Sequence, residues 1–289
     1  MHDVIARSLI EGQQAGMRYC LAAPRRSSRG DAGIQMGRQA GESMEFMDHR
    51  EYQPGDDLRR LDWAAYARSD KMIVNVYRQE VSPHIDVVID GSRSMAFGGT
   101  QKLRAALALA AALATAAGNA GHTHRAFLTG QGCQPVVHGS EQPRLWQGVA
   151  FDSRESPPAS FHTLPPAWRL RGIRVIVSDL LWLGDPLELL TSLSDRAAAV
   201  YVLQVLAADD AAPPLRGNVR LVDSETGAVE EVFLDASDLT RYRKHLQQHR
   251  ENWHHAARQV GAVFLPLVAE ELCKNWDFGP LLEAGILTL

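Results

Sequence analysis

The sequence is poor in cysteine, in long apolar runs and in charge of one sign, and each shortage excludes a class of protein. Three cysteines in 289 residues, none in a C-x-x-C pair, argue against a disulfide scaffold and a zinc ribbon and favour a reducing, cytoplasmic location. A formal net charge of −4 gives no polycationic footprint, so we expect no nucleic-acid partner. The longest apolar run, residues 105–117, falls short of the roughly 20 residues that span a bilayer, so we expect no stable membrane insertion.

Hydrophobic residues make up 45% of the chain, and their pattern predicts an α/β domain behind a different N-terminal region. From about residue 84, near-continuous apolar strands alternate with helices, which is typical of a doubly wound, mostly parallel sheet covered on both faces. We therefore expect an N-terminal arm and charged, β-containing clasp over 1–80, and the α/β domain over 81–289. The expected strands are 72–81, 84–90, 122–129, 172–179, 198–207 and 262–267, the helices 101–118, 186–197 and 237–261, and a hairpin 218–234.

Two of the expected strands end in an acidic residue. The stretch VVIDGSRSM brings a buried strand to Asp90, with Ser92 and Ser94 at alternate positions behind it, and VIVSD ends on Asp179. Ligands of such sheets bind outside the carboxyl ends of the strands, so we expect these side chains to meet there. Carboxylate and hydroxyl oxygens suit Mg²⁺ or Mn²⁺, and the pattern therefore predicts a divalent-metal site. The alternative is that Asp90 and the serines form a turn and cap the next helix.

A hydroxyl from a further loop is expected to complete the protein's share of the ligands. The segment SPPASFHTLPP, residues 156–166, offers Ser160 and Thr163 shortly before the strand that ends on Asp179. The residues alone leave the two nearly equal, with Thr163 slightly preferred.

The acidic strand ends carry a resemblance to a known family. VVIDGSRSM resembles the metal-ion-dependent adhesion site of von Willebrand factor type A domains, and VIVSDLL resembles that family's second acidic strand end. The resemblance implies a Rossmann-type sheet and a metal that keeps one coordination position open for the carboxylate of a protein partner. It also implies the ligand set: Asp90, Ser92 and Ser94 from the first loop, Thr163 from the second and Asp179 from the third. The stretch after the threonine shows no clear helix and departs from the family's pattern.

A narrower resemblance runs from about residue 45 to the end of the chain. REYQPGDDLRRLDWAAYARSD, followed by the D-x-S-x-S strand, is similar to the signature of the bacterial family called domain of unknown function 58. LVDSETGAVEEVFLD and GAVFLPL resemble its C-terminal half. Members are typically encoded beside MoxR-type AAA+ ATPases. The resemblance therefore implies an assembly or chaperone-like system, with a MoxR-type ATPase or its substrate as the partner.

The charged segment REYQPGDDLRRLDW has two interpretations. Pro54 and Gly55 predict a turn, and the acidic and basic residues nearly balance. We favour a structural clasp in which the charges pair and Trp63 packs inward. The alternative is a protein-binding surface formed by Arg59, Arg60 and Trp63.

Two histidines have the spacing of a helical metal site. His245 and His249 are four residues apart, but the residues between them lack the glutamate of an H-E-x-x-H motif. Apolar residues instead recur at three- and four-residue intervals, which is typical of a helix stripe that faces a core. We favour a packed or solvent-edge role over zinc. The stripe is Leu239, Tyr242, Leu246, His249, Trp253, Ala257 and Val260.

These patterns favour a metal-dependent protein-binding module over an enzyme. No G-x-x-x-x-G-K-[ST] loop is present, so we do not expect the chain to bind ATP itself. The enzymatic alternative is a Mg²⁺-dependent phosphohydrolase of the haloacid dehalogenase type with Asp90 as nucleophile. That chemistry needs a second Asp two residues on, where this chain has Ser92. A third hypothesis is a structural scaffold whose metal site holds no ion.

Overall fold

The computed structural model describes residues 1–23, 44–53, 61–69, 71–79, 83–96, 101–213, 217–224 and 226–289. The chain divides into two compact units, one formed by Met1–Ser27 with Pro83–Leu289 and the other by Ser28–Ser82. The larger unit contains the α/β fold, and the smaller one contains an antiparallel strand pair.

A six-stranded, mostly parallel sheet forms the centre of the larger unit, in the order β11-β8-β7-β4-β5-β6. Only β6 runs antiparallel to its neighbour, β5. The mixed α/β fold and the mostly parallel sheet predicted from the sequence are confirmed, and β6 was not predicted. The strands are β4 (His84–Ile89), β5 (Thr123–Gly130), β6 (Gly132–Pro135), β7 (Ile173–Ser178), β8 (Ala199–Leu206) and β11 (Val263–Val268).

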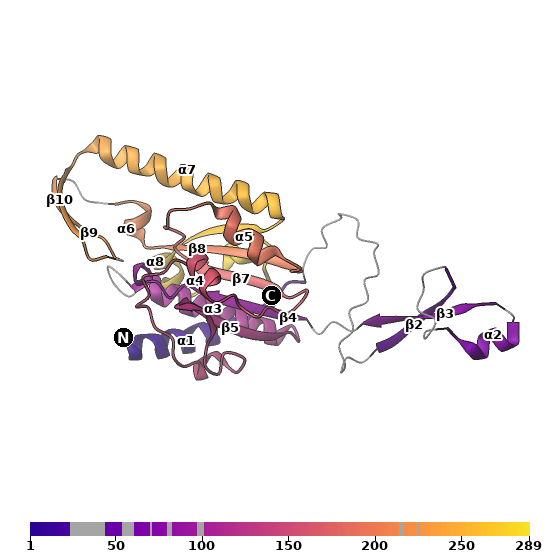
Figure 1. Cartoon of the computed structure of the whole chain (residues 1–289). Coiled ribbons are helices and arrows are strands. Elements are labelled where there is room, and N and C mark those ends of the chain that lie inside the picture. The colour runs from indigo at the N-terminus through magenta and orange to yellow at the C-terminus, as the bar shows by residue number, and fades with distance from the viewer. Residues whose placement is uncertain are drawn as a thin grey trace. The chain divides into compact units, whose positions relative to one another are not determined.

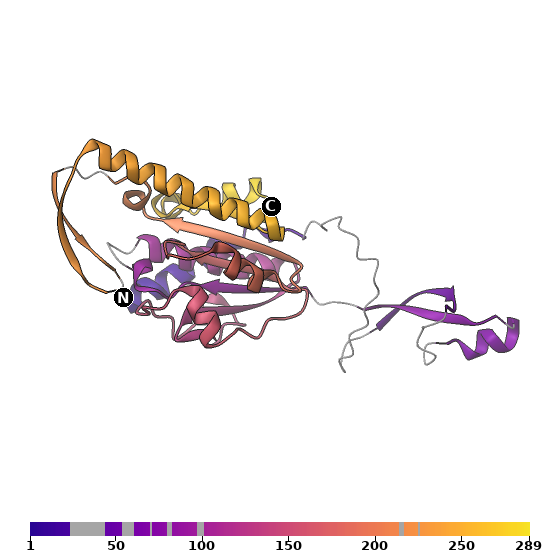
Figure 2. The same cartoon turned by 45° about the horizontal axis from the view of Figure 1, so that its top comes forward.

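Helices cover both faces of this sheet, so its central strands are buried throughout. Every residue of β4 is buried, and its side chains alternate between two cores because successive residues of a strand face opposite sides. Val87 and Ile89 join the core formed with α1 (His2–Gly16) and α3 (Gln101–Asn119), whereas Val88 joins the core formed with α5 (Pro186–Ser194) and α7 (Ala236–Val260). Figures 1 and 2 show these helix pairs on opposite sides of the strands.

The alanine-rich helix α3 is buried, and α1 packs closely against it. Ile5 and Leu9 of α1 lie in the shared core, and Gly12 lets the two backbones approach. A Cβ atom at Gly12 would lie 2.2 Å from the carbonyl oxygen of Ala108, so only glycine fits there. The structure therefore differs from the expected division at residue 80, because this apolar contact places residues 1–27 with the α/β unit.

The smaller unit contains β2 (Met44–Glu51), α2 (Trp63–Ser69) and β3 (Ile73–Gln79), with β2 and β3 antiparallel. The strand expected over 72–81 is confirmed by β3. Trp63 is 62% exposed and contacts Tyr66 edge-on, so the expectation that it packs inward is wrong. Pro54, Gly55, Arg59 and Arg60 lie outside the described residues, and the pairing of charges in this segment stays a prediction.

The remaining elements are short or peripheral to the sheet. The hairpin expected around Gly227 is confirmed by β9 and β10, which lead into the N-terminal end of α7 (Figure 2). No helix in the described ranges is long and apolar enough to cross a membrane. The short or peripheral elements are β1 (Cys20–Leu21), η2 (Arg93–Ala96), η3 (Pro143–Leu145), α4 (Pro157–Thr163), α6 (Ala208–Ala211), β9 (Gly217–Val222), β10 (Val229–Leu234), α8 (Ala269–Asn275), α9 (Gly279–Glu283) and β12 (Leu287–Thr288).

Candidate metal centre

Asp90 follows β4 at the carboxyl edge of the sheet and receives hydrogen bonds from both neighbouring strands. Its backbone N–H donates to Val177 of β7 over 3.0 Å, which continues the parallel ladder and seats the residue between β5 and β7. The Ser178 hydroxyl from β7 donates to Oδ2 over 2.5 Å, and the Thr129 hydroxyl from β5 donates to Oδ1 over 3.4 Å. The N–H of Ser92 donates to Oδ1 over 2.9 Å. The carboxyl group is fully buried, and these three donors set its orientation.

Ser92 and Ser94 come together beside Asp90. Their hydroxyl oxygens are 2.9 Å apart and share a hydrogen bond, and Ser94 lies in the short helix η2. Ligands on adjacent corners of an octahedron, each about 2.0–2.1 Å from Mg²⁺, are about 2.9 Å apart. The spacing of these two hydroxyls therefore fits one edge of such a coordination shell.

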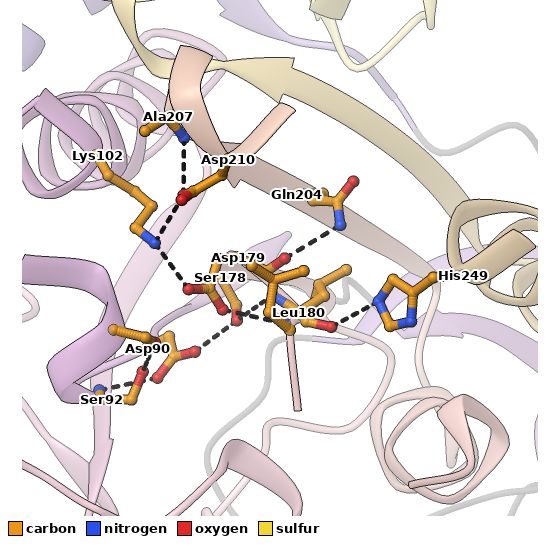
Figure 3. A network of polar contacts seen from close by, with 12 residues as sticks. Asp90, Ser92, Lys102, Ser178, Asp179, Leu180, Gln204, Ala207, Asp210 and His249 are labelled. Carbon is orange, nitrogen blue, oxygen red and sulfur yellow. Dashed lines mark hydrogen bonds and ion pairs between the residues drawn. The ribbon is translucent and has the colours of Figure 1, made fainter. Parts of the chain in front are cut away.

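Asp179 follows β7 and is buried against a lysine that the sequence analysis did not identify. The ammonium of Lys102, in the first turn of α3, lies 3.0 Å from Oδ2 of Asp179 and 3.1 Å from Oδ2 of Asp210 (Figure 3). The other oxygen of Asp179 accepts the N–H of Leu181 over 3.1 Å. Both carboxylate oxygens of Asp179 thus have partners within the chain, while each keeps a further lone pair.

The electrostatics of the group differ between its two ends. Burial, reinforced by the charge of Asp179, raises the pKa of Asp90 to about 6, despite the hydrogen bonds from Ser178 and Ser92 that favour its ionised form. Burial disfavours the ammonium of Lys102, but the charges of Asp179 and Asp210 outweigh it and hold the pKa of Lys102 above its ordinary value. The three ionised carboxylates and one ammonium leave a net charge of minus two.

The turn after Asp179 is held by residues from two further elements. Leu180 has a φ of 58°, a left-handed conformation that is strained for leucine. Its carbonyl accepts a hydrogen bond from His249 of α7 over 2.7 Å, and the Asp179 carbonyl accepts one from Gln204 of β8 over 3.1 Å (Figure 3). His249 therefore supports the site through the backbone, in line with the packing role favoured for it, whereas His245 is exposed.

The structure does not bring Thr163 to the carboxylates. Thr163 is exposed at the end of α4, and its hydroxyl donates to Ala159 within the same helix over 3.1 Å. Ser160 is buried, but its hydroxyl donates to the carbonyl oxygens of Gly130 and Ser156. Thr163 is thus the last residue of a helix, and hydrogen bonds to backbone carbonyls occupy both predicted hydroxyls.

The segment that lies beside the first loop is instead the one around Ser153. The N–H of Ser153 donates to the carbonyl of Gly91, and its carbonyl accepts the N–H of Arg93 over 2.9 Å, which pairs Ser153 with Ser92 as a short parallel bridge. This residue precedes the predicted segment and has no motif that marks it. Only the pairing of two loops reveals it.

Thr129, Ser178 and Lys102 are the other members that sequence reasoning missed. Ser178 is the last residue of β7 and Thr129 the penultimate residue of β5, the two strands beside β4, so a hydroxyl near a strand's carboxyl end was the available signal. Lys102 stands in the first turn of a helix that starts at this edge. No group of three or more histidine, cysteine or acidic side chains suited to a metal gathers in the described part of the chain, so a metal here would need hydroxyl or water ligands as well.

Fold and site together define an α/β protein with a buried acidic and hydroxyl-rich centre at the carboxyl edge of a mostly parallel sheet. The chain belongs to the family described as protein of unknown function DUF58, whose model matches residues 48–252.

Proteins similar to this chain include uncharacterized proteins of Mycobacterium bovis and of two strains of Mycobacterium tuberculosis. Each is 28% identical in an alignment of 264 residues that covers 84% of this chain and 80% of the relative. An aerotolerance-related membrane protein from Bacteroides fragilis aligns with a TM-score of 0.39 at 14% identity, over 70% of this chain and 96% of that one. The conserved hypothetical protein BatB from Bacteroides thetaiotaomicron aligns at 0.33 and 10% identity, over 67% and 98%. At these TM-scores the structural likeness carries no functional argument.

Proposed function

We propose that this protein is a metal-dependent protein-binding module of the von Willebrand factor A type. In this proposal Asp90, Ser92 and Ser94 hold Mg²⁺ or Mn²⁺ at the carboxyl edge of the sheet, and Asp179 contributes a second carboxylate. The bound ion supplies a directional acceptor for an acidic side chain of a partner. Thr163 is not part of this ligand set, because its hydroxyl bonds to a carbonyl of its own helix.

The observation that carries the proposal is the environment of Asp90. An ionised carboxylate buried without a cation is costly, and such groups are normally paired or bound to metal. In the described part of the chain no lysine, arginine or histidine forms an ion pair with Asp90, whose contacts are the donors named above. The net charge of minus two on the surrounding group matches one divalent cation.

The partner that the family resemblance supports is a MoxR-type AAA+ ATPase or its substrate. A module of this kind binds rather than catalyses, which agrees with the absence of a second acid two residues after Asp90. Ser92 stands at that position, and its hydroxyl lies against Ser94. No observation favours the phosphohydrolase alternative.

One observation favours a second candidate, a structural role without metal. The Lys102 ammonium already neutralises Asp179 from within the chain, as a permanent internal cation would. In that case Asp90 would be either protonated or ionised without a bound cation, and added metal would have no effect on stability.

Thermal unfolding with and without metal separates the two candidates. A ligand that binds only the folded state stabilises it by roughly 2.7 kcal/mol at a hundredfold excess over its dissociation constant. We expect MgCl₂ or MnCl₂ to raise the melting temperature of the wild-type protein and of Asp209→Asn, an exposed control on α6. We expect no rise for Asp90→Asn. Equal melting temperatures with metal and with EDTA in the wild-type protein would contradict the proposal.

A further inference from the structure

A groove of about 620 Å³ opens next to the candidate metal centre. It lies between the β5–β6 hairpin and the segment 147–154. Three of its lining residues are tied directly to the centre. Thr129 bonds Asp90 and the N–H of Gly91, Ser153 pairs with the first loop, and Arg93 stands between the two serines of that loop.

The side chains of the groove are cationic and amide-rich. Arg93 and Arg154 line it, together with Gln131, Gln134 and Gln147, and Asp152 is its one acidic lining residue among those described. The Arg93 Nε donates to the backbone carbonyl of Asp152 over 3.1 Å, which orients the guanidinium without neutralising it. In the described part of the chain neither arginine forms an ion pair with a carboxylate, so both remain available to an anionic ligand. A guanidinium matches a carboxylate in a two-point hydrogen bond.

We propose that this groove binds an extended acidic segment of a protein partner. The inference rests on the proposed function, because the segment continues from the carboxylate that the metal binds. Successive same-side residues of an extended chain are about 6.6–6.8 Å apart. Of two acidic residues at alternate positions, one can therefore bind the metal and the next can contact the arginines. The glutamine amides can donate to and accept from the peptide backbone, and such groups fix the orientation of a segment without demanding particular side chains.

Charge complementarity selects this occupant. A basic or neutral segment would leave both arginines and the cation without partners. The volume alone would admit a small molecule, but the groove is continuous with the metal edge, and its amide lining suits a backbone that runs along it.

Binding of defined peptides tests the inference. The probe is a fluorescein-labelled Gly-Glu-Gly-Glu-Gly-Glu-Gly peptide, with a counterpart carrying Gln in place of each Glu, followed by anisotropy in excess MgCl₂. Arg93→Gln and Arg154→Gln are each expected to weaken binding of the acidic probe about fivefold, the effect of one partly exposed charge pair. Arg243→Gln, on the exposed side of α7 away from the groove, is the matched control and should bind as the wild type does. The Gln peptide should bind more weakly than the acidic probe.

The outcomes distinguish failure of the groove inference from failure of the metal-dependent function. If the arginine variants lose no more affinity than Arg243→Gln, or if the acidic probe fails to bind the wild type at about 1 mM, the weak end of specific binding, the inference is overturned. The metal-dependent rise in melting temperature would be unaffected by that failure. If the arginine variants weaken binding while EDTA and Asp90→Asn do not, the groove is supported and the metal-dependent function fails.

Discussion

Asp90→Asn should stabilise the metal-free protein. The pKa of Asp90 rises from an ordinary 3.8 to about 6, and about two units at roughly 1.4 kcal/mol each correspond to a cost of about 3 kcal/mol for the buried, ionised group at neutral pH. Asparagine removes that charge and keeps the shape. Its amide oxygen can accept the N–H of Ser92, and its amide nitrogen can donate to the hydroxyl of Ser178. Gain of stability on removal of a functional residue is a known trade-off of binding sites.

The sign of the pH dependence follows from the same shift. Between pH 3.8 and about 6 the folded protein retains a proton on Asp90 that the unfolded chain releases. The contribution of Asp90 to stability therefore falls as pH rises through this interval and is constant above it. The advantage of Asp90→Asn should grow over the same interval and vanish at its acidic end.

Urea unfolding in EDTA, at a series of pH values, measures this advantage, and Asp209→Asn serves as the exposed control on α6. Repeating the series with MgCl₂ should reverse the order, because the metal stabilises only the protein that keeps the carboxylate. If Asp90→Asn is less stable than the wild type in EDTA at neutral pH, the buried charge of Asp90 does not destabilise the metal-free protein, and the reasoning is refuted. A gap that persists unchanged at acid pH would refute the same reasoning.

Three further substitutions test other parts of the structure by thermal unfolding. Lys102→Met leaves the buried carboxylate of Asp179 without its ammonium, so it should cost roughly 3–5 kcal/mol in EDTA. It should also enlarge the Mg²⁺-dependent rise in melting temperature, whereas a smaller rise would show that the lysine helps to build the metal site. Gly12→Ala forces apart the two helices that meet there and should cost about 1–3 kcal/mol, while Gly118→Ala, which meets nothing within 4 Å, should cost nothing. His249→Ala removes the donor to the strained turn and should lower both the melting temperature and the response to Mg²⁺; the exposed His245→Ala should change neither, and an equal loss in both would support a histidine metal pair instead.

Part of this site was predictable because it follows from local patterns. An apolar run that ends in an acid identifies a strand and the residue at its end, and parallel strands bring such ends to one edge. Asp90 and Asp179 were placed in this way, and the structure seats them after adjacent strands. The prediction of Thr163 as a metal ligand was wrong for an equally local reason. Helix α4 ends at Thr163, and a threonine within a helix satisfies its hydroxyl on the carbonyl four residues earlier.

The order of strands and helices along the chain, and with it the α/β fold, is determined by the periodicity of apolar residues, because period and burial are properties of neighbouring positions. The partners of the acidic residues are decided by tertiary structure alone. Lys102 meets Asp179 across 77 positions, and Ser178 meets Asp90 across 88, since adjacent strands in the sheet need not be adjacent in the chain. Whether a buried acid faces an ammonium, a hydroxyl or another acid depends on that adjacency. The charge that a bound cation would have to balance therefore depends on it as well.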